Sequence, residues 1–216
     1  CIRDRLRTNT TAIGAVMVHR GEADSLICGT FGEYHWHLKY AEQILGNERL
    51  KPKGALSLLI LEDGPLFIAD TQVWTEPTPQ QIANTAIGAA RHVRRFGVEP
   101  KIALCAQSQF GNLDGGTGER MREAIKILDS SKRNFLYEGE MNIDTALDSE
   151  LRTKILPDNR LIGDANVLIF AHADAASGVR NILKMRAGGL EVGPILMGMA
   201  NRVHIVSLSL IHISEP

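Results

Sequence analysis

The sequence contains few of the residues that carry specialised chemistry. Its three cysteines, Cys1, Cys28 and Cys105, do not have the spacing of a metal-binding motif. Cys28 and Cys105 lie at the ends of apolar runs, as reduced thiols in the core of a cytoplasmic protein do. The sequence also has neither a P-loop nor a dinucleotide-binding fingerprint. These absences argue against a cysteine metal site and a standard nucleotide-binding loop.

The sequence also lacks a large excess of charge of one sign and lacks long apolar runs. The formal net charge is -1, and no basic stripe of the kind that neutralises phosphates is evident, so we expect no nucleic-acid partner. No apolar run approaches the ~20 residues that span a bilayer, and no signal peptide is visible, so we expect no membrane partner. The chain is nevertheless 44% hydrophobic, which is enough to bury a substantial core.

The two ends of the sequence do not look native. The chain begins at Cys1 rather than at a methionine. Its last segment, 207–216, has no cap or loop chemistry and resembles translated adapter sequence. We therefore expect residues 1–206 to form one partial domain, truncated at both ends, and residues 207–216 to be a non-native tail.

Strand and helix signals alternate along most of the chain. Apolar periodicity and caps predict helices over 10–21, 33–45, 80–96, 117–128, 144–156 and 174–187. Strands are predicted over 23–28, 55–61, 66–70, 102–106, 135–137, 166–171, 192–197 and 203–206. The runs 102–106 and 166–171 are continuously apolar, which is typical of interior strands. The pattern predicts an α/β fold with a mostly parallel sheet and helices on both faces.

The turn that follows the strand at 102–106 is the first candidate site. It consists of Ser108, Gln109, Phe110 and Gly111, and ligands in open α/β sheets bind outside the carboxyl ends of strands. The Gly-rich loop 111–118 then leads to a helix, whose first backbone N–H groups could hold a phosphate. A plain strand-to-helix loop is the alternative interpretation, and it stays open.

Other polar residues give weaker signals. Asp174 and Ser177 follow the strand at 166–171, where Asp174 could be a helix N-cap and also line a cleft. His35 and His37 are two residues apart in a predicted helix, so they face different ways and are expected on its surface rather than in a metal pair. Residue chemistry alone predicts an α/β ligand-binding domain without a catalytic constellation.

Three strings resemble the phosphate acetyl/butyryl transferase family, in the family's order. They are 20–29 (RGEADSLICG), 96–104 (FGVEPKIAL) and 192–198 (VGPILMG). Within that family, 29–32 (GTFG), Tyr34, 36–38 (WHL) and 108–111 (SQFG) are most similar to the C-terminal transferase-like domain of the large bacterial NADP-dependent malic enzymes. The resemblance extends from about Arg7 to Val206. It implies an isocitrate-dehydrogenase-like three-layer α/β/α sandwich with two lobes.

The chain departs from the transferases at several positions. Where they carry a Ser-Thr pair and then an Arg, a gapless alignment places Glu33 and Tyr34, and then Lys39. Near the C-terminus, Ile205 replaces an Asp and Leu208 replaces an Arg. Hydroxyls and an arginine suit an acyl phosphate, whereas a carboxylate repels it. The resemblance, with these departures, implies a domain without transferase activity.

By this resemblance the chain is a regulatory and oligomerisation domain that binds acetyl-CoA or a related small molecule. The upstream malic-enzyme domain of its parent would decarboxylate malate oxidatively to pyruvate with NADP and Mg²⁺ or Mn²⁺, in a cytoplasmic homo-oligomer. An active phosphate acetyltransferase and a purely structural oligomerisation domain are the alternatives. No catalytic residue, metal ligand or cofactor is expected within the chain. The candidate ligand-binding residues are Gly29, Thr30, Ser108, Gln109, Phe110, Gly111, Asp174 and Ser177.

Overall fold

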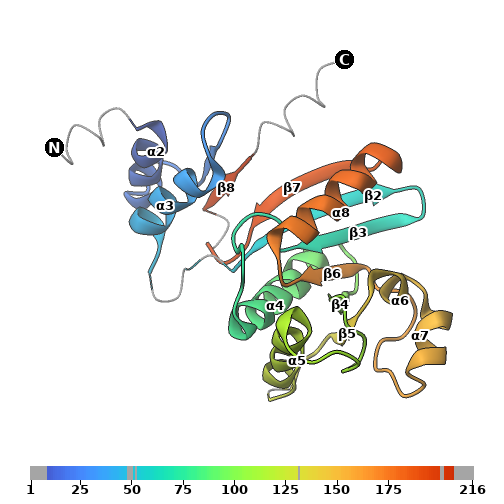
Figure 1. The fold of residues 1–216 in the computed structure, drawn as a ribbon. Coiled ribbons are helices and arrows are strands. Elements are labelled where there is room, and N and C mark those ends of the chain that lie inside the picture. The colour runs from blue at the N-terminus through green and yellow to red at the C-terminus, as the bar shows by residue number, and fades with distance from the viewer. Residues whose placement is uncertain (1–8, 48–50, 52, 131, 200–201, 207–216) are drawn as a thin grey trace.

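The computed structural model describes residues 9–47, 51, 53–130, 132–199 and 202–206, which form two sheets (Figure 1). The larger sheet has six strands in the order β5-β4-β6-β3-β2-β7. In chain order these are β2 (Ala55–Leu61), β3 (Gly64–Ala69), β4 (Lys101–Cys105), β5 (Leu136–Met141), β6 (Val167–Phe170) and β7 (Leu190–Leu196). The smaller sheet pairs β1 (Leu26–Cys28) with β8 (Val203–Ile205).

The larger sheet is mostly parallel, as the sequence predicts. The neighbours β5, β4, β6 and β3 run parallel, while β2 pairs antiparallel with both β3 and β7. Both continuously apolar runs became interior strands, since β4 and β6 pair with each other near the middle of the sheet. All of β6 and nearly all of β4 are buried, which confirms that prediction.

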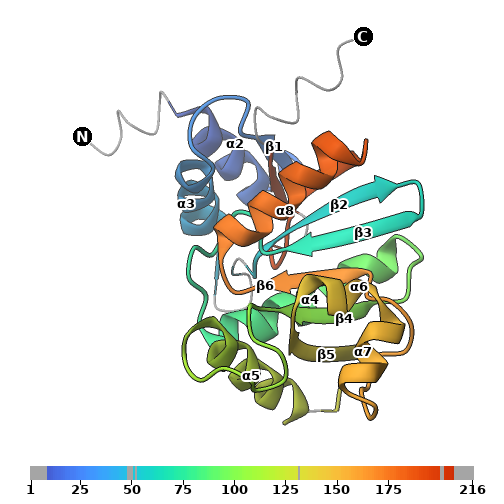
Figure 2. The ribbon, with the colours of Figure 1, turned by 45° about the vertical axis from the view of Figure 1, so that its right-hand side comes forward.

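Helices cover both faces of this sheet (Figure 2). On one face, α4 (Pro79–Arg95) and α5 (Gly116–Asp129) pack against a core that includes Phe67, Ile102 and Ile169. On the other face, α6 (Ile143–Leu147) and α8 (Ala173–Arg186) pack over Ile68 and Leu168, and α7 (Ser149–Ile155) adjoins α6. The result is the predicted three-layer α/β/α sandwich. No helix in the described part of the chain is both long enough and apolar enough to cross a bilayer.

A smaller lobe joins the beginning of the described chain to its end. The helices α2 (Thr10–His19) and α3 (Tyr34–Leu45) share a core with β1 and β8 that includes Ala15, Leu38 and Val203. Figure 1 shows these helices beside β8, away from α5, α6 and α7. The predicted tail 207–216 lies outside the described residues.

One helix residue has a different environment from the one predicted. His37 is buried, whereas His35 is exposed. The His37 Nε2 atom lies 2.6 Å from the carbonyl oxygen of Phe31, and Nδ1 lies 2.7 Å from the Thr11 hydroxyl. Because a carbonyl only accepts, Nε2 donates to Phe31, and Nδ1 is bonded to the Thr11 hydroxyl. The surface interpretation of His37 was wrong: the imidazole joins α2 to α3.

Two of the elements that differ from the sequence pattern have a clear physical reason. The predicted helix over 144–156 is two helices, because Asp148 adopts an extended backbone and its carboxylate accepts from the N–H groups of Glu150 and Leu151. That capping ends α6 and starts α7. The strand predicted over 135–137 runs to Met141, because the charged side chains of Glu138 and Glu140 find partners inside the fold.

Candidate functional site

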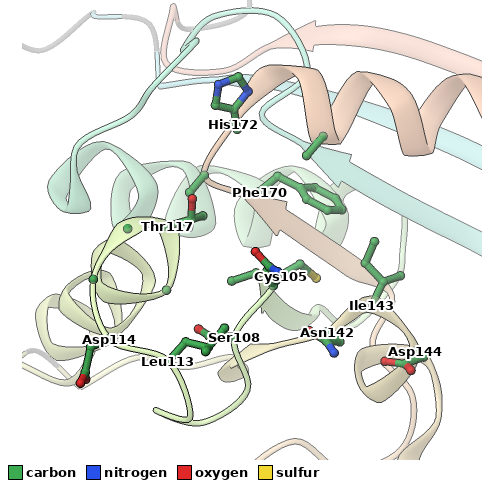
Figure 3. Close-up of a pocket in the computed structure, with 17 residues that line it drawn as sticks. Cys105, Ser108, Leu113, Asp114, Thr117, Asn142, Ile143, Asp144, Phe170 and His172 are labelled. Atoms are coloured by element: carbon green, nitrogen blue, oxygen red, sulfur yellow. The ribbon is translucent and has the colours of Figure 1, made fainter.

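A cleft of about 780 Å³ opens at the carboxyl ends of β4, β5 and β6. It is lined by residues 105–108, 113–118, 142–144, 170–172 and Ala175. Figure 3 shows Cys105 among these residues, with Ser108 and Asn142 on one side and Thr117 and His172 on another. Its volume lies within the ~300–1,000 Å³ of small-molecule sites, and its position is the one at which open α/β sheets bind ligands.

The N-terminus of α5 forms one wall of the cleft. Its N-cap residue is Gly115, at a φ of 75°, and no side chain caps the first turn. Gly118 lets the helix approach the neighbouring turn closely, because a Cβ atom there would lie 2.0 Å from the Ser108 Oγ atom. The first N–H groups of an α-helix carry a partial positive charge and bind anions. This wall can therefore accept a phosphate or carboxylate group.

A buried carboxylate holds the floor of the cleft together. The Glu140 Oε1 atom accepts from the Ser108 hydroxyl at 2.6 Å, the Gly111 N–H at 2.9 Å and the Arg122 guanidinium at 2.8 Å. The Glu140 side chain is only 1% exposed. Its Oε2 atom is buried and has no hydrogen-bond partner among the described residues. Glu140 thus ties the end of β5 to the turn after β4 and to α5.

The turn after β4 presents one of its four predicted residues to the cleft. Ser108 lines the cleft. The side chain of Gln109 bonds to the Thr145 hydroxyl, and Phe110 packs against the core beneath α6 and α8. Phe110 also has a φ of 46°, and its N–H donates to the Glu140 carbonyl oxygen at 2.8 Å. The turn is therefore shaped mainly by bonds that point away from the cleft.

Several titratable side chains line the cleft. Burial raises the pKa of the Cys105 thiol to about 12, so it stays protonated at neutral pH and is a poor nucleophile. Asp114, Asp144 and His172 also line the cleft. The His172 Nδ1 atom accepts from the Asp174 N–H at 3.2 Å, which caps α8. Within the described ranges, no three His, Cys, Asp or Glu side chains are grouped to hold a metal ion.

A family model described as phosphate acetyl/butaryl transferase matches residues 2–213. The chain belongs to this family. It is 42% identical over 201 residues to an NADP-dependent malic enzyme of Salmonella typhimurium, a match that covers 92% of the chain and 26% of the relative. A phosphate acetyltransferase of Nitratidesulfovibrio vulgaris is 28% identical, over 94% of the chain and 29% of that protein. The chain thus spans about a quarter of the length of these curated relatives.

A solved phosphotransacetylase has the same fold. The EutD phosphotransacetylase from Staphylococcus aureus is 26% identical to the chain and superposes with a TM-score of 0.81, covering 94% of the chain and 63% of that structure. A phosphotransacetylase from Streptococcus pyogenes is similar in fold, with a TM-score of 0.85 over 97% of the chain and 66% of the structure. The α/β/α sandwich is therefore the family's fold.

The remaining predicted site residues lie outside the lining of this cleft. The Asp174 side chain is 92% exposed, and the cap of α8 is His172 instead. Ser177 lies further along α8 and is half-buried. Gly29 and Thr30 follow β1 in the smaller lobe, where a Cβ atom on Gly29 would lie 2.2 Å from the Val206 carbonyl oxygen. Binding by these residues stays a prediction.

Three of the positions at which the chain is predicted to depart from the transferases, Glu33, Tyr34 and Ile205, lie in the smaller lobe, and Leu208 lies outside the described residues. Glu33 is the exposed residue before α3, and its side chain makes no capping hydrogen bond. Burial, and then the nearby Asp70 and Cys28, raise the pKa of Tyr34, whose hydroxyl has no hydrogen-bond partner among the described residues. Ile205 is fully buried in the lobe's core. That these positions lack the hydroxyl pair and carboxylate of the transferases stays a prediction from the resemblance.

Sequence reasoning missed four residues that shape the site: Glu140, Arg122, Asn142 and His172. The signal for Glu140 was a pair of glutamates, Glu138 and Glu140, beside a short strand pattern. The predicted strand ends at Tyr137, three residues before Glu140. With its amide in the orientation that satisfies both atoms, Asn142 donates to the carbonyl oxygens of Ala106 and Gln107 at 2.9 and 2.8 Å.

Proposed function

We propose that this chain is the phosphotransacetylase-like regulatory domain of a bacterial malic enzyme and binds acetyl-CoA without transferring its acetyl group. The observation that carries the proposal is that nearly the whole chain matches only about a quarter of a malic enzyme at 42% identity. The parent would oxidise malate to pyruvate with NADP and Mg²⁺ or Mn²⁺. Those ligands would be held by residues outside this chain.

The cleft offers complementary surfaces for a CoA thioester. The uncapped N-terminus of α5 suits a phosphate group of the nucleotide end. Phe170 and Ile143 offer apolar surface to the acyl-bearing arm, and Ser108 and Thr117 offer hydroxyls (Figure 3). Replacement of the side chains in the smaller lobe that would bind an acyl phosphate leaves these contacts intact. Acetyl-CoA binding and transferase chemistry are therefore separable in this protein.

Thr117→Glu is expected to weaken acetyl-CoA binding at least tenfold. Thr117 lines the cleft in the first turn of α5. A carboxylate there competes with the ligand's phosphates for the same N–H groups, and a charged hydrogen bond contributes roughly 1.5–3 kcal/mol. An acidic residue in the first turn does not destabilise the helix. Isothermal titration calorimetry with acetyl-CoA measures the effect.

Thr117→Gln is the matched control, because glutamine has the size of glutamate without its charge. Its affinity for acetyl-CoA is expected to lie within about threefold of that of the unsubstituted protein, because it adds no charge. Equal affinities for the Glu and Gln variants would place the ligand elsewhere. If millimolar acetyl-CoA gave no binding heat, the proposal would fail in favour of a purely structural oligomerisation domain.

Regulation is a separate expectation from binding. A ligand changes activity only if it binds one global state better than another, and such coupling is typically ~1–3 kcal/mol. Acetyl-CoA should therefore shift malate turnover of the complete parent by about 5- to 150-fold. Thr117→Glu should abolish the shift at the same acetyl-CoA concentration and leave basal malate turnover unchanged. An unshifted rate despite measured binding would contradict a regulatory role.

The homo-oligomer of the proposal has a candidate surface at the edge strand β7. Leu190 and Val192 on β7, and Ile60 on the adjoining β2, are exposed, although Ile60 and Leu190 are paired in register. Exposed apolar residues on an edge strand invite pairing with another chain. We therefore expect two copies to meet along β7.

Leu190→Glu is expected to dissociate such an oligomer, because it buries a charge at the interface. Sedimentation velocity reports the change in mass. Ile162→Glu is the control, since Ile162 is an exposed isoleucine between α7 and β6. If both variants sediment with the mass of the unsubstituted protein, the copies do not associate through β7.

A further inference from the structure

A second cleft, of about 630 Å³, lies between the end of α4 and the connection from α5 to β5. Five of its lining residues are cationic: Arg91, Arg94, Arg95, Lys132 and Arg133. The others are Ile87, Ala90, Asn134 and Phe135, so no carboxylate of the described residues lines it. We call this the basic cleft. A formal net charge of -1 for the whole chain conceals this local concentration of positive charge.

The basic cleft and the candidate acetyl-CoA site lie at opposite ends of the strands β4 and β5. Arg91 to Arg95 end α4, before β4 begins at Lys101, and Lys132 and Arg133 come before β5 begins at Leu136. Because β4 and β5 are parallel, both sets of residues lie near the amino ends of these strands. The acetyl-CoA cleft lies at their carboxyl ends. A ligand in one cleft therefore does not occupy the other.

Helix electrostatics explain only part of this cluster. Cations are favoured in the last turn of a helix, which accounts for Arg94 and Arg95 in α4. Lys132 and Arg133 belong to a different segment, yet they line the same cavity. Bringing like charges together costs energy unless an anion compensates them. The convergence of two basic segments on one cavity therefore points to an anionic ligand.

The positive charges are only partly compensated within the protein. Arg94 pairs with Glu99 at 2.6 Å and also donates to the Asn134 carbonyl oxygen. Glu99 is the only carboxylate paired with a cation of the cleft among the described residues. The Arg133 Nε atom is buried, and no described residue accepts a hydrogen bond from it.

The charges also act on a neighbouring histidine. Burial, followed by the positive charges of Arg95 and Arg91 and by His204, lowers the pKa of His92 to about 4.

We infer that the basic cleft binds a small organic polyphosphate, of the class of nucleoside di- and triphosphates. Guanidinium groups present paired donors that match phosphate oxygens, and several of them can engage successive phosphates. The cavity has the volume of a small-molecule site. Ile87, Ala90 and Phe135 give it an apolar wall against which the organic part of the ligand can pack. This site goes beyond the proposed binding of acetyl-CoA.

The test is a calorimetric titration of the full chain with ATP and, separately, with inorganic tripolyphosphate. Both probes are expected to bind at low salt, and tighter binding of ATP would show that its nucleoside contributes. Arg91→Gln and Arg133→Gln should each weaken ATP binding about tenfold, the loss of one charge-assisted hydrogen bond. Arg91 is exposed, so its variant tests the site even if Arg133→Gln unfolds. Arg186→Gln, at an exposed arginine in the last turn of α8, should change nothing.

Three results would overturn the inference. One is the absence of binding heat with both probes at millimolar concentration. Another is an equal effect of Arg91→Gln and Arg186→Gln. The third is loss of ATP binding in Thr117→Glu, which would place ATP in the acetyl-CoA cleft. Because Thr117→Glu and Arg91→Gln act on different clefts, failure here is distinguishable from failure of the proposed acetyl-CoA site.

Discussion

Replacing Glu140 by alanine is expected to lower the free energy of unfolding by about 3 kcal/mol, the loss typical when one partner of a buried ion pair is removed. The change leaves the Ser108 hydroxyl, the Gly111 N–H and the Arg122 guanidinium without their shared acceptor. These three groups come from the turn after β4 and from α5, so the floor of the cleft should loosen as well. Chemical denaturation followed by circular dichroism measures the loss.

Glu140→Gln separates the charge from the hydrogen bonds. A glutamine can still present one oxygen to the three donors, so it should lose less stability than alanine. Glu123→Ala is the surface control, because Glu123 is exposed on α5. Its effect should stay within about 0.5 kcal/mol. If Glu140→Ala were as stable as Glu123→Ala, the buried network would not hold the site.

The sheet could be predicted because its signal is local. The strands at Ile102 and Ile169 are uninterrupted apolar runs, which are typical of strands covered on both faces. The length of β5 was underestimated because Glu138 and Glu140 look like surface residues when read alone. Glu138 is in fact paired with the Arg160 guanidinium, and its carboxylate also accepts a hydrogen bond from the Arg160 backbone N–H at 2.8 Å. A partner 22 residues away cannot be recognised from periodicity.

The site was predictable in position but not in composition. The rule that ligands bind at the carboxyl ends of strands led to Ser108, which lines the cleft. It did not lead to Glu140, which touches Ser108 from 32 residues away. His37 shows the same limit: helical spacing says which way a residue faces, but not that Thr11 and Phe31 will bond to its ring. Contacts between distant segments determine how a polar residue is used.

The complete parent is expected to form acetyl phosphate from acetyl-CoA and phosphate at least a thousandfold more slowly than the ~10 s⁻¹ of a typical enzyme. The resemblance predicts that Ile205 stands where the transferases carry an aspartate, and Ile205 is fully buried in the core of the smaller lobe. It has no polar atom that could take or give a proton, and a positioned acid or base typically contributes 10²- to 10⁴-fold. By the resemblance, Glu33 adds a negative charge where the transferases have a hydroxyl.

A coupled assay of acetyl phosphate formation measures this rate, and malate turnover of the same preparation shows that the protein is folded. Acetyl-CoA titrated into that preparation tells whether the low rate reflects lost binding or lost chemistry. Binding without turnover is the expected combination, because the α5 wall of the cleft is retained while Ile205 replaces a carboxylate. A turnover near ~10 s⁻¹ would show that transfer does not need the replaced side chains, and the chain would then be an active phosphate acetyltransferase.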